Sequence, residues 1–477
     1  MSPPRDLSFV SQSRQPEVLR CGRLAPSLKA NTNLDRIESQ PVSTASRANS
    51  SRAVLENACT VRVHDALFHK RGATMRDFLL RLTMTIASCL CVAVTRADEL
   101  GLKQVTIDGQ VTIYAPGSEI GHTMPQVRRH PDGAIYVNGC RSGLFKSTDN
   151  GKSWTRITWA FDPNGFGISR DGRLWLVDRR DKTESSVILI IQSADGGRTW
   201  QRQELDCGPL AAGGADDPYT AVTPHGAYTN FIERPDGTLM FSVSMRYKDW
   251  GDFNNRDQSR PGMRDVMVRT ADGGKTWGDP TIVHQHATET DFAIDPSNAD
   301  HLLAFTRIQR RMLPGEDRSE TGCSFGWPYK NGLLLDSTDG GRTFRALPGG
   351  MTECYGHRGS ILWTDNNVIV VTRNHGCKTI EERRARGHSG AAVEAQISLN
   401  GGRTWVDDGP GGTPHLNRAK PFTLVPFRKA HSFTCPTVEL SKNRFLTVFV
   451  TGETTEKTTS IQSVVWHIET TPPPTKK

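Results

Sequence analysis

The stretch Ser147-Thr148-Asp149-Asn150-Gly151-Lys152-Ser153-Trp154 decides the fold, because the chain repeats its pattern four more times. The pattern is Ser/Thr-x-Asp-x-Gly-x-x-Trp/Phe, and the further copies lie at 193–200, 270–277, 337–344 and 398–405. Phe344 replaces the tryptophan in the fourth copy, and Asn400 replaces the acid in the fifth. We call each copy a box. Five boxes in one chain indicate a repeated structural unit.

Each position of a box has a physical role in a tight turn between two strands. The Asp or Asn side chain accepts hydrogen bonds from backbone N–H groups just downstream, and the glycine supplies a positive φ without a Cβ penalty. The aromatic side chain packs beneath the turn and buries a large apolar area. A box resembles the start of a calcium loop, but no Glu follows at the twelfth position, so we expect no metal. We therefore interpret these box residues as structural: Asp149, Asp195, Asp272, Asp339 and Asn400.

Pairs of apolar strands joined by a turn precede the boxes. Three pairs, at 125–137, 167–177 and 230–241, turn at an Asp-Gly dipeptide, which is a strong hairpin signal. Three more pairs lie at 291–305, 360–371 and 437–449. A further apolar stretch at 463–468 follows the sixth pair, and no box comes after it. A strand pair, a third strand, a box and a fourth strand together make one four-stranded sheet.

The spacing of the boxes predicts how these sheets are arranged. The Asp or Asn positions of successive boxes are 46, 77, 67 and 61 residues apart, whereas one propeller blade needs roughly 40–50 residues. The surplus is expected in loops. Six sheets closed in a ring give an all-β, six-bladed β-propeller. Its last blade lacks a box and would be completed by an early strand at 104–107 or 111–114. A solenoid is the alternative, although its repeats are usually shorter and more uniform.

The N-terminal region is predicted to be a leader. Met75 begins a basic stretch, an apolar run follows at 82–94, and Ala97 supplies a small-residue cleavage site, as in a secretory signal peptide at 75–97. The apolar run is too short to span a membrane. Residues 1–74 are rich in Ser and Arg without periodicity, so we expect them to be disordered or to reflect a start codon assigned too early.

These boundaries leave residues 98–470 for the propeller and 471–477 for a disordered tail. The product is expected in the periplasm or outside the cell. The stretch Ile86-Ala87-Ser88-Cys89 resembles a lipobox, which keeps a lipoprotein as an alternative.

Charge and cysteine content narrow the classes of partner. Residues 1–97 hold 14 of the 59 Lys and Arg residues and 7 of the 51 Asp and Glu residues, which leaves 45 bases and 44 acids for the rest. A nearly neutral folded part argues against nucleic-acid binding. No C-x-x-C pair occurs, so we expect no zinc, and nothing indicates a cofactor. Six cysteines after residue 97 permit disulfides, but the sequence selects no pairing: Cys140, Cys207, Cys323, Cys354, Cys377 and Cys435.

Strand direction sorts the loops between the two faces of the ring. In up-and-down blades, the turns between strands 1 and 2 and between strands 3 and 4 share one face, and the boxes occupy it. The long segments 247–263, 309–329 and 375–390 then lie on the opposite face, which we call the mouth, where function is expected. Charged residues predicted at the mouth are His122, Asp178-Arg179-Arg180, Asp216-Asp217, Arg246, Glu289, Asp291, Arg307, His357 and Arg373.

The boxes resemble those of the sialidase superfamily, over roughly residues 118–468. Thr288-Glu289-Thr290-Asp291 with Leu302–Arg307 resembles the family's blade that runs from an acid to an Arg, and Tyr355-Gly356-His357 with Val370–Asn374 resembles its next blade. The resemblance implies three arginines for a sialate carboxylate, a Tyr–Glu nucleophile pair and an Asp acid/base. Glu289 would then activate the Tyr, and Arg307 and Arg373 would be two of the arginines.

The chain departs from the family pattern in three places. Thr123-Met124-Pro125 stands where the family has Arg-Ile-Pro, so Arg128, Arg129 or Arg141 would have to supply the first arginine. The first-blade loop that should offer the Asp reads Asn138-Gly139-Cys140-Arg141-Ser142. The sixth blade, near the expected Tyr, reads Ser432-Phe433-Thr434-Cys435-Pro436.

Two functions remain open. One is an exported glycoside hydrolase for an acidic or decorated glycan, with Glu289 and Asp291 as catalytic carboxylates. A carboxyl separation of about 5 Å would suit retention and roughly 6.5–9.5 Å inversion. The other is a propeller that binds glycan or protein without catalysis. The sugar, the linkage and the oligomeric state stay open. The predicted substrate-binding residues are Arg246, Arg307, His357 and Arg373.

Overall fold

The computed structural model describes residues 101–115, 124–159, 161–179, 186–211, 221–226, 229–247, 263–308, 331–352, 358–375, 392–409, 411–426, 434–451 and 460–471. All of them belong to one compact unit, Thr85–Lys477. The predicted signal peptide and N-terminal extension lie outside these residues, as do 472–477. Within the described part, no helix is long and apolar enough to cross a membrane.

The described residues form six antiparallel sheets, and each of four sheets consists of four strands that are consecutive in the sequence. Blade 1 contains β2 (Gln126–Arg129), β3 (Ile135–Asn138), β4 (Leu144–Ser147) and β5 (Thr155–Ile157). Blade 2 contains β6 (Pro163–Ile168), β7 (Leu174–Arg179), β8 (Val187–Ser193) and β9 (Gln201–Asp206). Blade 4 contains β15 (Ala287–Asp295), β16 (Asn298–Ile308), β17 (Gly332–Ser337) and β18 (Arg345–Met351). Blade 5 contains β19 (Ser360–Trp363), β20 (Ile369–His375), β21 (Ala392–Ser398) and β22 (Phe422–Val425).

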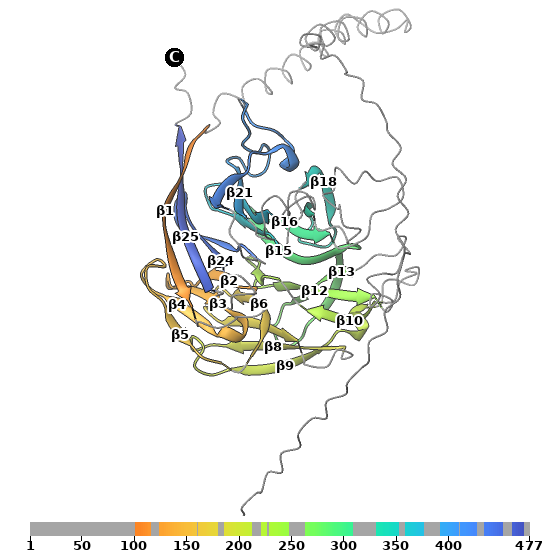
Figure 1. Cartoon of the computed structure of the whole chain (residues 1–477). Helices are drawn as coiled ribbons and strands as arrows, with labels where there is room; N and C mark the ends of the chain where they lie inside the picture. The colour runs from red at the N-terminus through yellow and green to blue at the C-terminus, as the bar shows by residue number, and fades with distance from the viewer. Residues whose placement is uncertain are drawn as a thin grey trace, which may run out of the picture. The chain divides into compact units, whose positions relative to one another are not determined.

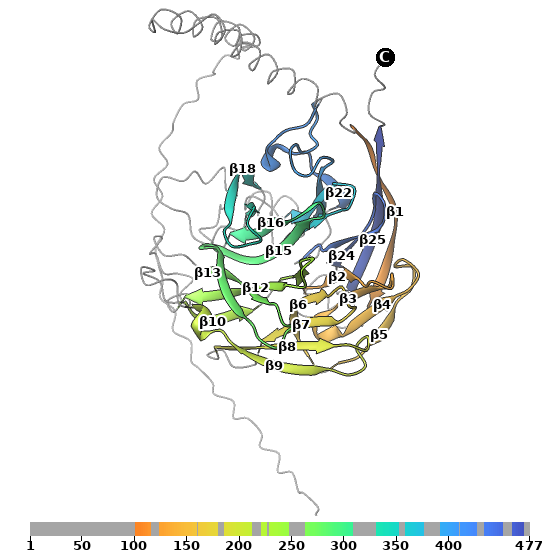
Figure 2. The same ribbon diagram turned by 180° about the vertical axis from the view of Figure 1, so that it is seen from behind.

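Blade 6 closes the ring by joining the two ends of the described chain. Its strands are β23 (Thr437–Ser441), β24 (Arg444–Thr451), β25 (Ser460–Thr471) and β1 (Gly101–Tyr114). β1 pairs with β25 along its whole length, and the two lie side by side in orange and blue in Figures 1 and 2. Both early stretches predicted to complete this blade belong to β1. The six-bladed propeller is confirmed.

Blade 3 differs from the prediction in its first strand. That strand is in two pieces, β10 (Ala221–Gly226) and β11 (Ile232–Glu233), which both pair with β12 (Leu239–Tyr247). β13 (Met263–Thr270) and β14 (Gly278–His284) complete the blade. The Asp-Gly turn indicated β11 but not β10, because β10 contains a proline and lacks an alternation of apolar residues.

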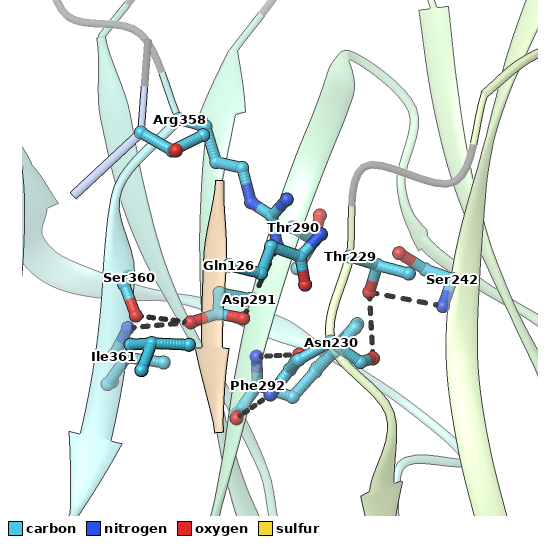
Figure 3. A network of polar contacts seen from close by, with 12 residues as sticks. Gln126, Thr229, Asn230, Ser242, Thr290, Asp291, Phe292, Arg358, Ser360 and Ile361 are labelled. Atoms are coloured by element: carbon cyan, nitrogen blue, oxygen red, sulfur yellow. Dashed lines mark hydrogen bonds and ion pairs between the residues drawn. The ribbon is translucent and has the colours of Figure 1, made fainter. Parts of the chain in front are cut away.

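The inner strands of neighbouring blades are bonded to one another around the axis. Between blades 1 and 2, Gln126 donates to the backbone oxygen of Asn164 at 2.5 Å. Phe166 of blade 2 forms a parallel bridge with Asn230 of blade 3. The Asn230 amide then exchanges two hydrogen bonds with the backbone of Phe292 in blade 4, at 2.7 and 2.8 Å (Figure 3).

The second half of the ring is joined in the same way. The Asp291 carboxylate of blade 4 accepts from the Ser360 hydroxyl of blade 5 at 2.6 Å. Arg358 forms a parallel bridge with Thr434, which precedes blade 6. The Thr434 hydroxyl donates to the backbone oxygen of Pro125 at 2.7 Å and so returns to blade 1. Polar contacts therefore connect all six inner strands.

The boxes share one hydrogen-bond pattern, illustrated by the second copy. Asp195 Oδ1 accepts from the backbone N–H groups of Arg198 and Thr199 at 3.0 and 2.9 Å, and Oδ2 accepts from the Thr199 hydroxyl at 2.6 Å. Gly197 N–H donates to Ser193 Oγ at 2.8 Å. The hydroxyl and N–H of Thr199 hold the pKa of Asp195 well below its usual range. The turn is thus closed by side-chain acceptors.

Boxes and the turns between strands 1 and 2 lie on the same face, as predicted. Gly340 N–H of the fourth box donates to the Asp300 oxygen at the start of β16 at 2.8 Å. Gly401 N–H of the fifth box donates to the Asn367 oxygen in the turn before β20 at 2.9 Å. The second strands β16 and β20 therefore begin at the box face and end at the opposite face.

The core lies between the blades, and box aromatics are part of it. Trp277 of the third box packs edge-on against Trp175 and Phe241, with ring centroids 5.9 and 5.0 Å apart. Gly274, at φ +87°, permits this packing, because a Cβ there would lie 2.3 Å from the Trp175 ring. Each box thus anchors its own blade to the preceding one.

Candidate active site

The mouth face carries the arginines at the ends of the second strands. Arg307 is the last residue but one of β16, and Arg246 holds the same place in β12. Arg373 lies two residues before the end of β20. The structure therefore places all three at the predicted ends of their strands, whereas His357 lies outside the described residues, directly before Arg358.

Glu289 occupies a β-bulge at the start of blade 4. The register between β15 and β16 shifts between the pairs Thr288–Arg307 and Asp291–Phe305, so Glu289 and Thr290 together oppose the single residue Thr306. Glu289 has a φ of +62°, a conformation that residues with a Cβ rarely adopt. Bulges re-aim side chains, and strained backbone of this kind concentrates at functional sites.

The bulge directs the Glu289 carboxylate at Arg307. Glu289 Oε1 lies 2.8 Å from Arg307 Nη2, and both side chains are more than nine-tenths buried. Glu289 Oε2 is buried too, and no described residue forms a hydrogen bond with it. One oxygen is therefore fixed by an ion pair, while the other is available to a ligand.

Asp291 lies two residues further on and ties three blades together. Its Oδ1 lies 3.2 Å from Arg128 of blade 1 and 3.5 Å from Arg358 of blade 5. Its Oδ2 accepts from the Ser360 hydroxyl at 2.6 Å and from Ile361 N–H at 3.2 Å. Figure 3 shows Asp291 facing Ser360 and Ile361, with the Arg358 side chain extending toward the same region. Both carboxylate oxygens are engaged.

Arg358 is buried, Arg128 is half-buried with 15% of its side chain exposed, and both have Asp291 as counter-ion. Burial lowers the pKa of both guanidinium groups, and Asp291 opposes this effect. Arg128 comes from the blade opposite Asp291 in a ring of six, so its side chain reaches across the axis. Of the three arginines considered for the missing family position, only Arg128 does so: Arg129 donates to the Glu439 oxygen, and Arg141 is exposed and pairs with Asp162.

Asp265, at the start of β13, is a third buried carboxylate. It accepts from the Ser244 hydroxyl at 2.5 Å, and from the N–H of Thr290 at 3.2 Å and its hydroxyl. Burial raises the pKa of Asp265 to about 6 in spite of these hydrogen bonds, and the charge of Glu289 adds to the rise.

These groups form one electrostatic unit. Arg358 interacts with Asp291, Arg128, Glu289 and Asp265. We call the following residues the mouth cluster: Arg128, Asp265, Glu289, Asp291, Arg307 and Arg358.

Arg373 and Arg246 lie near the ends of their strands at the same face of the ring as this cluster. Arg373 faces Glu394 at 3.5 Å, and its Nε and Nη1 atoms are buried without a described hydrogen-bond partner. Arg246 is half-buried and pairs in register with Met263. Asp178 accepts from Asp162 N–H at 3.1 Å. Four other residues predicted at the mouth lie outside the described part: His122, Arg180, Asp216 and Asp217.

Sequence patterns missed Asp265 and Arg358 as site residues. Asp265 follows Arg264 in a strand whose eight residues are all buried. A charged pair directly before the apolar run Val266–Val268 was the available signal, because buried charges need partners. Arg358 directly follows the Gly-His dipeptide that resembled the family, and its role depends on ring geometry.

Metal and thiol chemistry have no support among the described residues. No group of three His, Cys, Asp or Glu side chains there has metal-binding geometry. Cys140, Cys207 and Cys435 are buried free thiols. Cys140 lies in the short first-blade loop, and burial raises its pKa to about 12, so it is a poor nucleophile.

Comparison with known proteins gives structural matches only. No protein-family model matches the chain, and no curated protein matches its sequence. A protein of unknown function from Dyadobacter fermentans is 18% identical over 76% of this chain and 99% of its own, with a TM-score of 0.50. Trypanosoma rangeli sialidase in complex with sialic acid is 11% identical over 76% of this chain and 57% of its own, with a TM-score of 0.45.

A third solved structure widens the range of chemistry among the matches. An alpha-l-arabinofuranosidase from Fusarium graminearum is 14% identical over 77% of this chain and 96% of its own, with a TM-score of 0.44. These structures are similar to the chain at low identity, and the six-bladed propeller itself is shown by the arrangement of the chain's own six sheets.

Proposed function

We propose that this protein is a glycoside hydrolase acting on an acidic or otherwise decorated glycan, with Glu289 as the catalytic carboxylate. One observation carries the proposal: buried polar atoms in and beside the mouth cluster have no described partner. Glu289 Oε2 is an acceptor of this kind, and Arg358 Nη1 is a donor. Buried polar groups in folded proteins are nearly always hydrogen-bonded, so such atoms point to a ligand.

The chemistry of glycoside cleavage suits a buried carboxylate. The glycosidic bond breaks through a transition state with positive charge on the sugar ring, which a carboxylate stabilises as a nucleophile or as an electrostatic partner. The Arg307 ion pair fixes one oxygen of Glu289 and directs the other. Stabilisation of this kind is strongest where water is excluded and the groups are held in advance.

The arginines favour an anionic substrate. Arg358 and Arg373 retain buried N–H groups without a described partner. Guanidinium groups recognise carboxylate and sulfate-like oxygens through paired hydrogen bonds. A sugar carrying a carboxylate or sulfate would satisfy these donors.

Asp291 remains the predicted second carboxylate. Proton transfer by Asp291 requires a substrate to displace one of its partners, and its longest contact is that of Oδ1 with Arg358, at 3.5 Å. Until that happens, Asp291 positions the two arginines.

The test is hydrolysis of a glycan panel by the purified full chain. The panel contains sialosides, sulfated glycans and uronic-acid glycans, together with neutral arabinosides. We expect turnover on an anionic member and its loss, by at least about a hundredfold, in Glu289→Gln, because the variant cannot carry the negative charge. Glu439→Gln is the matched control, since Glu439 caps a box-face turn by accepting from Asn443 N–H.

The outcomes separate the two functions that the sequence left open. Equal turnover by wild type and Glu289→Gln removes Glu289 from the mechanism. Glycan binding without turnover by the wild-type chain supports the alternative, a non-catalytic binding propeller.

We also propose that the protein is exported, with cleavage before Asp98. The basic start at Met75 and the apolar run at 82–94 support this proposal. N-terminal sequencing of the secreted product should begin at Asp98. A product retained in the cytoplasm with its leader intact would contradict the proposal.

A further inference from the structure

We propose that Asp265 is a positioning residue, which holds the bulge at 288–290 in place through Ser244 and Thr290 and thereby presents Glu289. This inference rests on the proposed catalytic role of Glu289.

The first connection runs through the Ser244 hydroxyl. Ser244 donates to Asp265 Oδ1 at 2.5 Å, and its oxygen accepts from Glu289 N–H at 3.2 Å and from the Thr288 hydroxyl at 3.0 Å. A serine hydroxyl has one hydrogen and two lone pairs, so these three bonds satisfy it completely. The orientation of the Glu289 peptide thus depends on Ser244, and that of Ser244 on Asp265.

The second connection runs through Thr290. Its N–H and hydroxyl both contact Asp265 Oδ2, and the hydroxyl lies 2.7 Å from Thr306 Oγ1. Thr306 Oγ1 in turn lies 3.3 Å from the backbone oxygen of Thr288. The two peptide groups that flank the side chain of Glu289 are therefore both held by the Asp265 network.

Hydrogen counting couples this network to the charge of Asp265. If the carboxyl is protonated, it donates to Thr290, which donates to Thr306, which donates to the Thr288 oxygen, so every hydroxyl has an acceptor. If the carboxylate is ionised, Thr290 must donate to Asp265 instead, and the direction of the chain changes. Burial raises the pKa of Asp265 to about 6. The charged groups that influence it are Glu289 of β15 and Arg358 beside β19, and the titratable His284 of β14 lies opposite it in the strand register.

A left-handed conformation at Glu289 needs such support. The φ of +62° is unfavourable for a residue with a Cβ, so it persists only where neighbours determine it. Without the contacts from blade 3, we expect the bulge to relax and the carboxylate to leave its place beside Arg307.

Two variants test the proposal, and a third is the control. Asp265→Asn removes the charge at constant size, and Ser244→Ala removes only the hydroxyl. Asp336→Asn is the control, because Asp336 is also buried but lies next to a box and binds Arg345 and His301 at 2.7 and 2.9 Å.

Two readouts are measured on the full chain. In hydrogen exchange, both test variants should speed exchange at the amides of Glu289 and Thr290 by at least about tenfold. Kinetics are measured on the glycan of the panel that the wild type cleaves. Both test variants should lower kcat by about 10–100-fold with KM little changed, as is usual for groups that orient a functional residue. In the wild type, kcat should change with pH near pH 6, and this change should be absent from Asp265→Asn. The double variant should have a kcat no lower than that of the less active single variant. Asp336→Asn should change neither readout.

The possible failures are distinguishable. A wild-type chain that cleaves no glycan overturns the proposed function, whatever the exchange data show. An active wild type whose Asp265→Asn and Ser244→Ala variants keep their exchange rates, kcat and pH profile overturns the positioning role alone. Lower stability with an unchanged pH profile would also overturn it, because that is the result of a purely structural contact.

Discussion

Among the single residues of this protein, the buried charged side chains stand out. Three arginines and three acids share the mouth cluster, and burial of such groups is costly unless each is paired. Asp291 shows the consequence most clearly, since it is the counter-ion of both Arg128 and Arg358 and also bonds Ser360 of blade 5. Its side chain joins three blades at the axis.

Asp291→Ala should therefore be strongly destabilising. The variant removes the counter-ion of the buried Arg358 and of the half-buried Arg128, and breaking a buried pair typically costs about 3–5 kcal/mol. Urea unfolding followed by tryptophan fluorescence measures the loss. A cost below about 1 kcal/mol would show that the arginines find other partners, and Ser360→Ala, which removes one hydrogen bond, should cost distinctly less.

The pH dependence of stability reports on Asp265. Its pKa of about 6 in the folded state exceeds its ordinary value of 3.8, so the folded state binds the extra proton. The free energy of unfolding should fall as pH rises from about 4 to 6, by up to ~3 kcal/mol, and change no further above that. Asp265→Asn should lack this fall when urea midpoints are compared at pH 4.5 and 7. An identical fall in wild type and variant would contradict the assignment.

The boxes are the structural elements that repeat in this chain, and the fifth copy shows which of their features the turn needs. Asn400 accepts from Thr404 N–H at 2.9 Å, as the acids do, while its Nδ2 donates to the Thr404 hydroxyl at 2.9 Å. The hydroxyl that donates in the other boxes can therefore turn to accept. An acceptor oxygen at this place is therefore enough to close the turn, and a negative charge strengthens the hydrogen bonds that it accepts.

A matched pair of variants at Asp195 tests this view. Asp195→Asn should lower the Tm little, because it can adopt the Asn400 arrangement, whereas Asp195→Ala should lower it more by leaving two backbone N–H groups without their acceptor. Because the pKa of Asp195 is lowered in the fold, its contribution is present at neutral pH and lost as pH falls through the acid range. Calorimetry at pH 7 and pH 3 checks both points, and an equal loss of Tm in the two variants would contradict them.

Closure of the ring is the decisive feature at the scale of the whole molecule. β1 and β25 pair antiparallel from Gly101–Thr471 to Tyr114–Ile461, so the last blade is built from both ends of the described chain. The ring is also held at its axis, where each inner strand is bonded to the next. Loss of either connection would expose inter-blade core.

Deletion of residues 98–115 tests the closure. Without β1, blade 6 loses its fourth strand and the side chains of Leu102, Val105 and Ile113, which belong to the same hydrophobic clusters as the buried Ile468 and Val465. We expect an aggregating chain without a cooperative thermal transition. A chain that starts at Asp98 is the control and should unfold cooperatively. A cooperative transition of the shortened chain at an unchanged Tm would contradict the closure.

The sequence predicted the fold far better than the site, for physical reasons. A box is local, because acceptor, glycine and aromatic lie within eight residues, so five copies reveal both the blades and their polarity. The mouth cluster is not local: Arg128, Asp265 and Arg358 come from blades 1, 3 and 5 and meet only when the ring closes. Glu289 was predictable from its resemblance to a family motif, but its bulge and its partners depend on packing against blade 3.

The most direct test of the central claim is a crystal structure of Glu289→Gln soaked with the panel glycan that the wild type cleaves, a sialylated trisaccharide being the first probe. We predict that a sugar ring lies against residue 289 and that the anionic group of the glycan lies within hydrogen-bond distance of Arg358 or Arg373. A glycan bound at the box face, with the mouth cluster empty, would contradict it.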